Sequence, residues 1–280
     1  MGGVNFLSVI LDILLMKFNA KPRFVHFMPL ISGGFNVESG IYRESQSISI
    51  QFETKLNNIS KVLPDCYKPT ERTVVSASFS YNNGVDFMAG GGYNIGSISV
   101  PAKFQGEEDN VEGSYVVVMY EDKTYPIILG REFLGVPKVY GDISPVKILP
   151  DGRIRCEVSV WGHLLFGIEV ELSSKLSDQV IESMNKDPSG GSPMLGYKYI
   201  PSIDGPPDCA YPIATPSDSI IKEIWSGEKG RIYYGEPSWD DVGIHKNILD
   251  VIKSLKCGKV VGVSRSFSSY KLRSDAKRLV

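Results

Sequence analysis

A strict alternation of apolar and polar residues is the feature that most limits how this chain can fold. Residues 73–81 place Val75, Ala77, Phe79 and Tyr81 on one side of the backbone and serines on the other. Successive side chains of an extended strand point to opposite faces of a sheet, so this period of two predicts a strand with one buried face. A helical chain would scatter the same residues around its axis.

A second alternating stretch predicts a pair of strands. Residues 153–160 and 166–172 both alternate, and a turn region at Gly162 and His163 lies between them. Two alternating runs joined by a short glycine-containing turn are typical of a β-hairpin. We therefore expect residues 153–172 to form a hairpin.

Weaker patterns fill in the rest of the chain. Further strands are predicted near residues 48–54, 114–120, 126–130, 194–200, 220–234 and 258–267. Helical periods occur at the N-terminus and at residues 55–63, 174–186 and 241–256. Many antiparallel strands with a few covering helices predict an α+β, mainly β fold, built on a closed or nearly closed barrel. The pattern alone does not choose between a barrel and a sandwich.

Length and charge set bounds on function. With 280 residues the chain can bury a sizeable core, and we expect a single domain over residues 1–280. Hydrophobic residues make up 42%, charged residues 22%, and the formal net charge is -2. This balance offers no excess of basic charge to attract nucleic acid or anionic lipid. Neither a nucleic-acid partner nor a membrane partner is expected.

The cysteines and the N-terminus point to a reduced, cytoplasmic protein. The four cysteines are widely spaced without a Cys-x-x-Cys pair, and three histidines are the residues that could supplement them as ligands, so no metal site is predicted. Residues 6–16 are apolar but lack a basic leader and carry Asp12. We expect residues 1–20 to form an amphipathic helical extension that packs on the body or on a neighbouring subunit. Thiols in such a protein are expected to be reduced.

One lysine stands out as a candidate for chemistry. Lys138 follows a proline in the segment Gly-Arg-Glu-Phe-Leu-Gly-Val-Pro-Lys-Val-Tyr-Gly at residues 130–141. Burial penalises an ammonium relative to the neutral amine, and a neutral amine is a nucleophile that can condense with a carbonyl. The plain alternative is an ordinary surface lysine at the end of a strand.

The whole segment, rather than the dipeptide, resembles the active-site segment of the acetoacetate decarboxylase family. Upstream, Tyr-Val-Val-Val-Met-Tyr at 115–120 and Tyr-Pro-Ile-Ile-Leu at 125–129 look like the two strands that lead into it. Downstream, Tyr-Lys-Tyr-Ile-Pro-Ser-Ile-Asp-Gly at 197–205 and Glu-Ile-Trp-Ser-Gly at 223–227 match in order and spacing. The resemblance covers about residues 40–265.

The resemblance implies a fold, a reaction and a site. The fold would be a cone-shaped antiparallel β-barrel of the acetoacetate decarboxylase type over residues 40–265, with Lys138 inside it. Lys138 would form an imine with a small keto acid, and loss of carbon dioxide would follow. Neither a metal nor an organic cofactor is implied. The family also implies a homo-oligomer, although subunits cannot be counted from one chain.

Site residues follow from the same resemblance, with departures. The family's second lysine after the nucleophile is replaced by Val139, and Ile95 stands where the decarboxylases carry an active-site glutamate, beside the polar Asn94. Arg43 is the nearest candidate for an arginine that binds the substrate carboxylate. Glu132 is the candidate for proton transfer or support of the site.

The predicted site is therefore a short set of residues. Lys138 and Glu132 are the predicted catalytic residues, and the predicted substrate-binding residues are Arg43, Asn94, Ile95 and Val136.

Three functions remain open on the sequence. The first is a decarboxylase of acetoacetate or a related β-keto acid. The second, which the changes at Ile95 and Val139 motivate, is an aldolase or dehydratase type of lyase that acts on a pyruvate-like keto acid. The third is a binding module in which Lys138 is catalytically silent, with a pKa near the ordinary ~10.4 of a lysine.

Overall fold

Two sheets make up most of the computed structural model, which describes residues 24–26, 28, 35–36, 40–186, 191–216, 218–272 and 276–280. The large sheet runs in the order β13 (Ser174–Lys175), β16 (Ser219–Gly227), β18 (Val260–Lys271), β3 (Ile41–Glu53), β5 (Val74–Val85), β6 (Tyr93–Gln105), β7 (Asn110–Glu121), β14 (Met194–Ile200), β15 (Cys209–Thr215) and β19 (Lys277–Arg278). Two short strands join it at the side, β4 (Tyr67–Pro69) on β6 and β8 (Lys138–Tyr140) on β7.

The small sheet and the helices lie against the large sheet. The small sheet runs in the order β10 (Lys147–Ile148), β11 (Ile154–Val160), β12 (His163–Glu171) and β17 (Lys229–Tyr234), with β9 (Asp142–Ile143) on β11. The strands β1 (Phe24–Val25) and β2 (Phe35–Asn36) pair with each other. The helices are α2 (Leu56–Ser60), η3 (Asp86–Met88), α3 (Thr124–Glu132), α4 (Asp178–Asn185), α5 (Trp239–Val242) and α6 (His245–Ser254).

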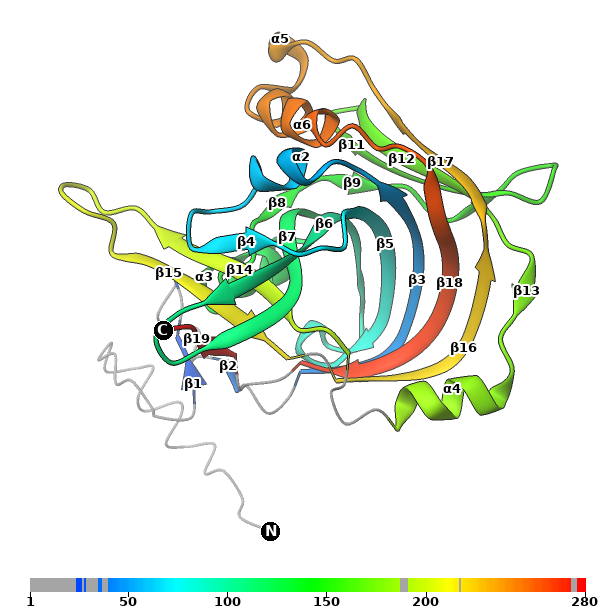
Figure 1. Cartoon of the computed structure of the whole chain (residues 1–280), viewed down its shortest axis with the longest axis horizontal. Helices are drawn as coiled ribbons and strands as arrows, with labels where there is room; N and C mark the ends of the chain where they lie inside the picture. Colours follow the sequence, from blue (N-terminus) through cyan, green and yellow to red (C-terminus); the bar gives the residue numbers. More distant parts are fainter. Residues whose placement is uncertain are drawn as a thin grey trace.

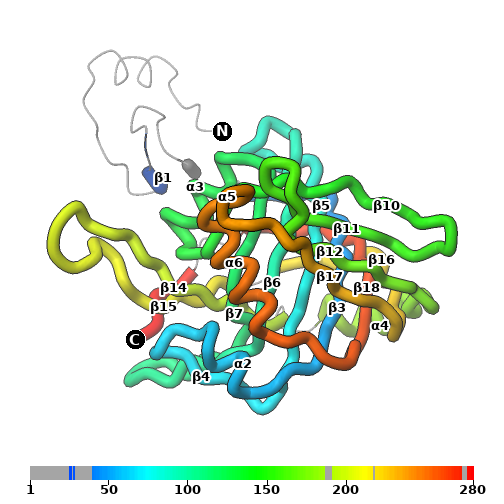
Figure 2. Tube along the Cα trace, turned by 90° about the horizontal axis from the view of Figure 1, so that it is seen from above, coloured from blue at the N-terminus to red at the C-terminus, as the bar shows by residue number. Residues whose placement is uncertain are grey.

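The large sheet is strongly curved. In Figure 1, strands β5, β3, β18 and β16 follow one another as arcs, and α4 lies beside β16. Figure 2 shows the β14–β15 hairpin extending away from the body, with the C-terminus beside it. Among the described strands the pairing runs from β13 to β19 and no pairing joins those two ends. The mainly β class is confirmed, whereas closure into a cone-shaped barrel stays a prediction.

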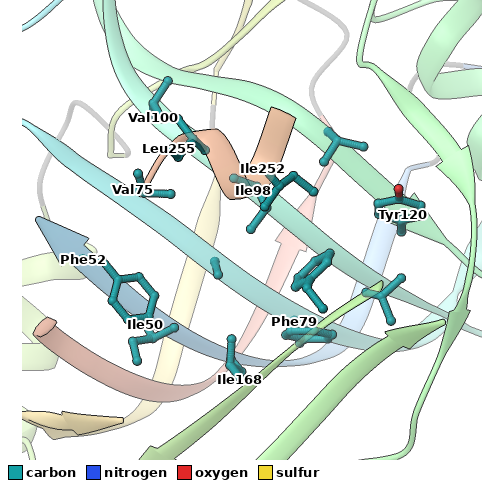
Figure 3. Close-up of a cluster of buried hydrophobic side chains, with 14 of the residues drawn as sticks. Ile50, Phe52, Val75, Phe79, Ile98, Val100, Tyr120, Ile168, Ile252 and Leu255 are labelled. Carbon is teal, nitrogen blue, oxygen red and sulfur yellow. The ribbon is translucent and has the colours of Figure 1, made fainter. Parts of the chain in front are cut away.

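The main core fills the space between one face of the large sheet, the small sheet and α6. Figure 3 shows Ile50 and Phe52 of β3, Phe79 of β5 and Ile168 of β12 in one cluster with Ile252 of α6. Each of these side chains is buried. Burying apolar side chains removes their surface from water and contributes roughly 25 cal/mol per Å². This packing explains the alternation in residues 73–81, because the apolar side chains of that strand face the core.

The other face of the large sheet carries hydroxyls and faces the site described below. Ser47 bonds Ser80 at 2.8 Å, and Ser78 bonds Ser97 at 2.9 Å, each across neighbouring strands. A serine directly opposite a serine lets the two hydroxyls bond each other within the sheet. One face thus holds the core and the other forms a polar surface.

One predicted strand is wrong. Residues 126–130 lie in the helix α3. A short apolar run is compatible with either structure, and here Pro126 stands in the first turn of the helix, where its missing N–H has no intrahelical acceptor to satisfy.

Most other predicted elements agree with the structure. The hairpin at 153–172 is confirmed as β11 and β12, which pair antiparallel. The region 220–234 is two strands, β16 and β17, that belong to different sheets. Strand β15 was not predicted. The predicted helix at 174–186 begins as the short strand β13, and α4 follows.

Two findings concern the ends of the chain and membranes. The predicted helical extension at residues 1–20 lies outside the described residues. In the part of the chain that the structure describes, no helix has the length and apolar character needed to span a bilayer.

Candidate active site

Lys138 begins β8, which pairs parallel with β7 opposite Met119. The chain reaches this position through a turn after α3, where Gly135 has a φ of 62°, a left-handed conformation that glycine adopts without strain. The backbone N–H of Met119 donates to the carbonyl of Pro137 at 3.1 Å and fixes the entry into the strand. Lys138 is only 8% exposed.

The side chain of Lys138 lies across a glycine. A methyl group added at Gly130 would come within 2.4 Å of Cε of Lys138. The ammonium Nζ donates to the carbonyl of Pro126 at 3.1 Å. From the end of the same helix, Nη1 of Arg131 donates to the carbonyl of Lys138 at 2.9 Å. Helix α3 therefore holds the lysine at both its backbone and its amine.

Glu121, the last residue of β7, is the charged partner of this lysine. Its Oε1 lies 2.7 Å from Nζ of Lys138, and the carboxylate is fully buried. Neither carboxylate oxygen makes a well-directed hydrogen bond to another described residue. Burial raises the pKa of Glu121, and the ion pair with Lys138 offsets only part of that rise.

Lys138 and Glu121 line a cavity of about 340 Å³ on the hydroxyl-bearing face of the large sheet. This volume is at the small end of the range of roughly 300–1,000 Å³ for ligand sites. Val116, Leu134 and Val136 form a buried apolar wall, to which Met119 and Met194 add partly buried side chains. Exposed Asp218 and Lys271 also belong to the lining, so the cavity opens to solvent there.

A cluster of tyrosines closes another part of the cavity. Tyr42 and Tyr93 share a hydrogen bond of 2.8 Å between their hydroxyls, and the rings of Tyr42 and Tyr270 stack with centroids 3.9 Å apart. All three line the cavity. Burial raises the pKa of each phenol, so the three remain neutral and keep their protons as hydrogen-bond donors.

The residues predicted from sequence divide into two groups. Lys138, Ile95 and Val136 all line the cavity. Asn94 instead donates its side-chain amide to Asp122 at 2.8 Å, because it points to the face opposite Ile95. Arg43 is exposed and is not among the lining residues of the cavity.

Glu132 also lies outside the cavity lining. It is half-buried at the end of α3, where neighbouring residues project in different directions around the helix axis. The carboxylate that meets Lys138 comes from the preceding strand instead. The proton-transfer role predicted for Glu132 therefore passes, in the proposal below, to Glu121.

Sequence reasoning missed Glu121 and the tyrosine cluster. Glu121 follows the continuous apolar run of residues 115–120, at a strand end where a charged residue ordinarily signals solvent. What places it in the cavity is register: β6 and β7 pair Ile95 with Glu121. In the described part of the chain, no group of three or more His, Cys, Asp and Glu residues is arranged to hold a metal ion.

Comparisons with known proteins agree with this fold. A solved structure described as "Structural Studies of Acetoacetate Decarboxylase" matches with a TM-score of 0.72 at 18% identity, covering 96% of this chain and 97% of that one. The enduracididine biosynthesis enzyme MppR complexed with pyruvate matches with a TM-score of 0.68 at 15% identity, covering 93% and 99%. At these identities the likeness defines the acetoacetate decarboxylase type of fold.

Sequence comparison then gives the family. Residues 27–259 match the sequence model of the family described as Acetoacetate decarboxylase (ADC). Acetoacetate decarboxylase 1 of Bradyrhizobium diazoefficiens is 27% identical over 223 residues, covering 76% of this chain and 80% of the relative. The chain belongs to the acetoacetate decarboxylase family, which confirms the resemblance and supports a decarboxylase-like lyase.

Proposed function

We propose that this protein is a lyase in which Lys138 forms an imine with the carbonyl of a small keto acid, with acetoacetate or a related β-keto acid as the substrate. The observation that carries the proposal is the isolated pair of Lys138 and Glu121, 2.7 Å apart inside the cavity. Both groups are removed from water, and each is the other's nearest charge partner. Such a pair can exchange a proton without solvent.

The first step of the reaction needs a neutral amine. Because burial favours the protonated form of Glu121, the ammonium proton of Lys138 can pass to Oε1 and leave an amine with a free electron pair. That nitrogen attacks the keto carbon and gives a carbinolamine. Glu121 then returns a proton to the carbinolamine hydroxyl, which leaves as water and yields the iminium ion.

The iminium ion then accepts electrons from the bond that breaks. When the bond to the carboxylate breaks, carbon dioxide leaves and its bonding electrons move into the iminium group, which becomes an enamine. Protonation at carbon and hydrolysis release the ketone and restore Lys138. The neutral tyrosines supply hydrogen-bond donors within the same cavity, and the apolar wall limits access of water.

A different lyase reaction is the second candidate. Ile95 occupies the place where the family carries a carboxylate, and the carboxylate of this chain lies across the strand pair at Glu121. MppR, whose fold this chain shares, is described as a complex with pyruvate. Aldol cleavage, condensation or dehydration of a pyruvate-like keto acid would use the same Lys138 imine. A silent binding module is the third candidate.

Intact mass after borohydride reduction tests the proposal. The unaltered protein and the Lys138→Ala variant are incubated with acetoacetate or pyruvate and sodium borohydride. An adduct that requires Lys138 is expected with acetoacetate, together with released acetone. An adduct with pyruvate alone would select the second candidate, and no adduct with either would leave the binding module. A homo-oligomer and a cytoplasmic location stay predictions.

A further inference from the structure

The cavity extends well beyond the surroundings of Lys138. Its lining includes Ser99 of β6, Ser114 of β7 and Thr215 of β15. Lys138 pairs with Met119, whereas Ser114 lies further back on the same strand β7. From Met119 to Ser114 the strand rises by roughly 15 Å at ~3.3 Å per residue, allowing for the bulge between them. The shortest keto acids cannot reach both ends at once.

One wall of the stretch between these ends is apolar, opposite the serines of β6. Val116, Leu134 and Val136 are each buried, and Met119 and Met194 pack against them. All five line the cavity. Aliphatic side chains offer no hydrogen bonds, and they gain free energy by covering apolar surface of a ligand. This middle section therefore suits a hydrocarbon segment.

The far end holds a hydroxyl without a partner. Thr215 is 4% exposed, and its Oγ1 has no hydrogen-bond partner among the described residues. Thr215 pairs with Met194, and Met194 pairs with Ser114, so the two hydroxyl-bearing residues lie in one cross-strand row. A buried hydroxyl that is left unsatisfied costs free energy, which a ligand group can recover by bonding to it.

Charge favours a neutral end group on the ligand. The charged residues in the lining are Glu121 and Lys138, which pair with each other, and Asp218 and Lys271, which are exposed. None of these is a buried cation that is free to pair with a second carboxylate at the far end of the ligand. A hydroxyl or an amide, by contrast, can bond the hydroxyls of Thr215 and Ser114 without any charge partner.

We infer that the substrate is an elongated keto acid, whose chain continues from the carbonyl as an aliphatic segment and ends in a neutral hydrogen-bonding group that meets Thr215. The inference rests on the proposed function, since the imine at Lys138 fixes the other end of the molecule. It narrows the substrate class, because acetoacetate fills only the part of the cavity nearest Lys138.

Calorimetric binding of unreactive analogues tests the inference without imine chemistry. Three hydroxy acids, in which the keto group is reduced, are compared: 3-hydroxybutyrate, a longer chain with a methyl end, and a chain of equal length with a hydroxyl end. We expect the hydroxyl-ended acid to bind about tenfold more tightly than the methyl-ended one, the effect of one satisfied hydrogen bond. The Thr215→Val variant should lose this preference, and the matched Thr215→Ser variant should keep it.

The outcomes separate the inference from the proposed function. If 3-hydroxybutyrate binds as tightly as the longer acids, or if Thr215→Val keeps the preference in a protein that unfolds as cooperatively as the unaltered one, the inference is overturned. Borohydride trapping of acetoacetate at Lys138 would then still support the proposed function. Conversely, the hydroxyl-ended acid could bind more tightly through Thr215 while no adduct forms at Lys138. That result would support the elongated binding site and contradict the imine mechanism.

Discussion

Two glutamates without solvent-exposed surface have pKa values shifted in opposite directions in this protein. Glu121 and Glu169 are both fully buried, and each faces cationic side chains. Glu121 meets one lysine, and its pKa is raised by burial. Glu169 lies between Arg155 and Arg231 in the cross-strand register of β11, β12 and β17, with Arg153 nearby, and its pKa is lowered by hydrogen bonds, first from Arg231.

The difference lies in the number of donors and in how near the surface the partners lie, since the side chains of Arg153, Arg155 and Arg231 are 33–59% exposed and that of Lys138 is 10% exposed. Arg155 and Arg231 each bond Glu169 through two nitrogens, at 2.6 and 2.9 Å and at 2.9 and 3.1 Å, so both carboxylate oxygens are satisfied. Glu121 has a single ion-pair contact. Guanidinium forks stabilise a charged carboxylate, whereas a lone ammonium leaves it close to accepting a proton. The first arrangement suits structure and the second suits proton transfer.

The largest effect is expected on activity, from a substitution of Glu121. Glu121→Gln should lower kcat/KM for the keto acid that forms an adduct by about 10²–10⁴, the usual contribution of general acid–base catalysis. Steady-state kinetics measures the loss. A variant that retains more than a third of the activity would mean that Glu121 only supports the fold.

The matched change at Glu169 should act on stability instead. Glu169→Gln removes the negative charge that the three arginines share and turns one of the two acceptor oxygens into an NH2 donor facing them. We expect the free energy of unfolding to fall by about 2–3 kcal/mol, near the lower limit for a broken buried pair because the arginines are partly exposed. Urea unfolding measures the change. Activity at low temperature should stay within about threefold; a loss as large as that of Glu121→Gln would erase the distinction between the two sites.

A substitution at Gly130 should test whether the position of the Lys138 side chain matters, because it displaces the amine without removing it. Gly130→Ala places a methyl group 2.4 Å from Cε of Lys138, and the flexible side chain moves aside at little cost in stability. We expect the rate of borohydride trapping to fall about tenfold or more through lost alignment with Glu121. Gly262→Ala is the control, since a methyl group there meets only a carbonyl oxygen at 3.9 Å. Equal rates for both variants would refute the alignment argument.

The pH dependence of unfolding should show opposite slopes for the two glutamates. Glu121 keeps its proton to higher pH in the folded state, because its pKa is raised there. The stability of the unaltered protein relative to Glu121→Gln should therefore fall as pH rises above ~4.3, the ordinary pKa of glutamate. Glu169 loses its proton more readily when folded, so stability relative to Glu169→Gln should fall as pH drops below ~4.3. Urea midpoints across pH measure both, and parallel slopes would contradict the comparison.

How far the sequence predicts this molecule depends on whether a feature is local. The alternation in 73–81 and in the 153–172 hairpin reports burial directly, and β5, β11 and β12 follow it. The run at 126–130 is too short for its period to separate strand from helix. Lys138 was found by its surrounding motif, whereas Glu121 enters the site only through the pairing of β6 with β7, which depends on tertiary register.

That register also explains a departure that looked damaging in the sequence. Ile95 stands where a family carboxylate is expected, and the structure pairs Ile95 directly with Glu121 on the neighbouring strand. Directly opposite side chains in an antiparallel pair are close neighbours on one face. A carboxylate is therefore available to Lys138 from β7.

The smallest effect is expected at Arg43, which the sequence favoured as the substrate-binding cation. Its side chain is exposed and outside the cavity lining, so Arg43→Ala should change KM and kcat by less than about twofold. Kinetics on the keto acid that traps at Lys138 measures this. A rise in KM of tenfold or more would show that Arg43 reaches the substrate carboxylate in the liganded protein, and the charge balance of the cavity would then include a cation beyond the Lys138–Glu121 pair.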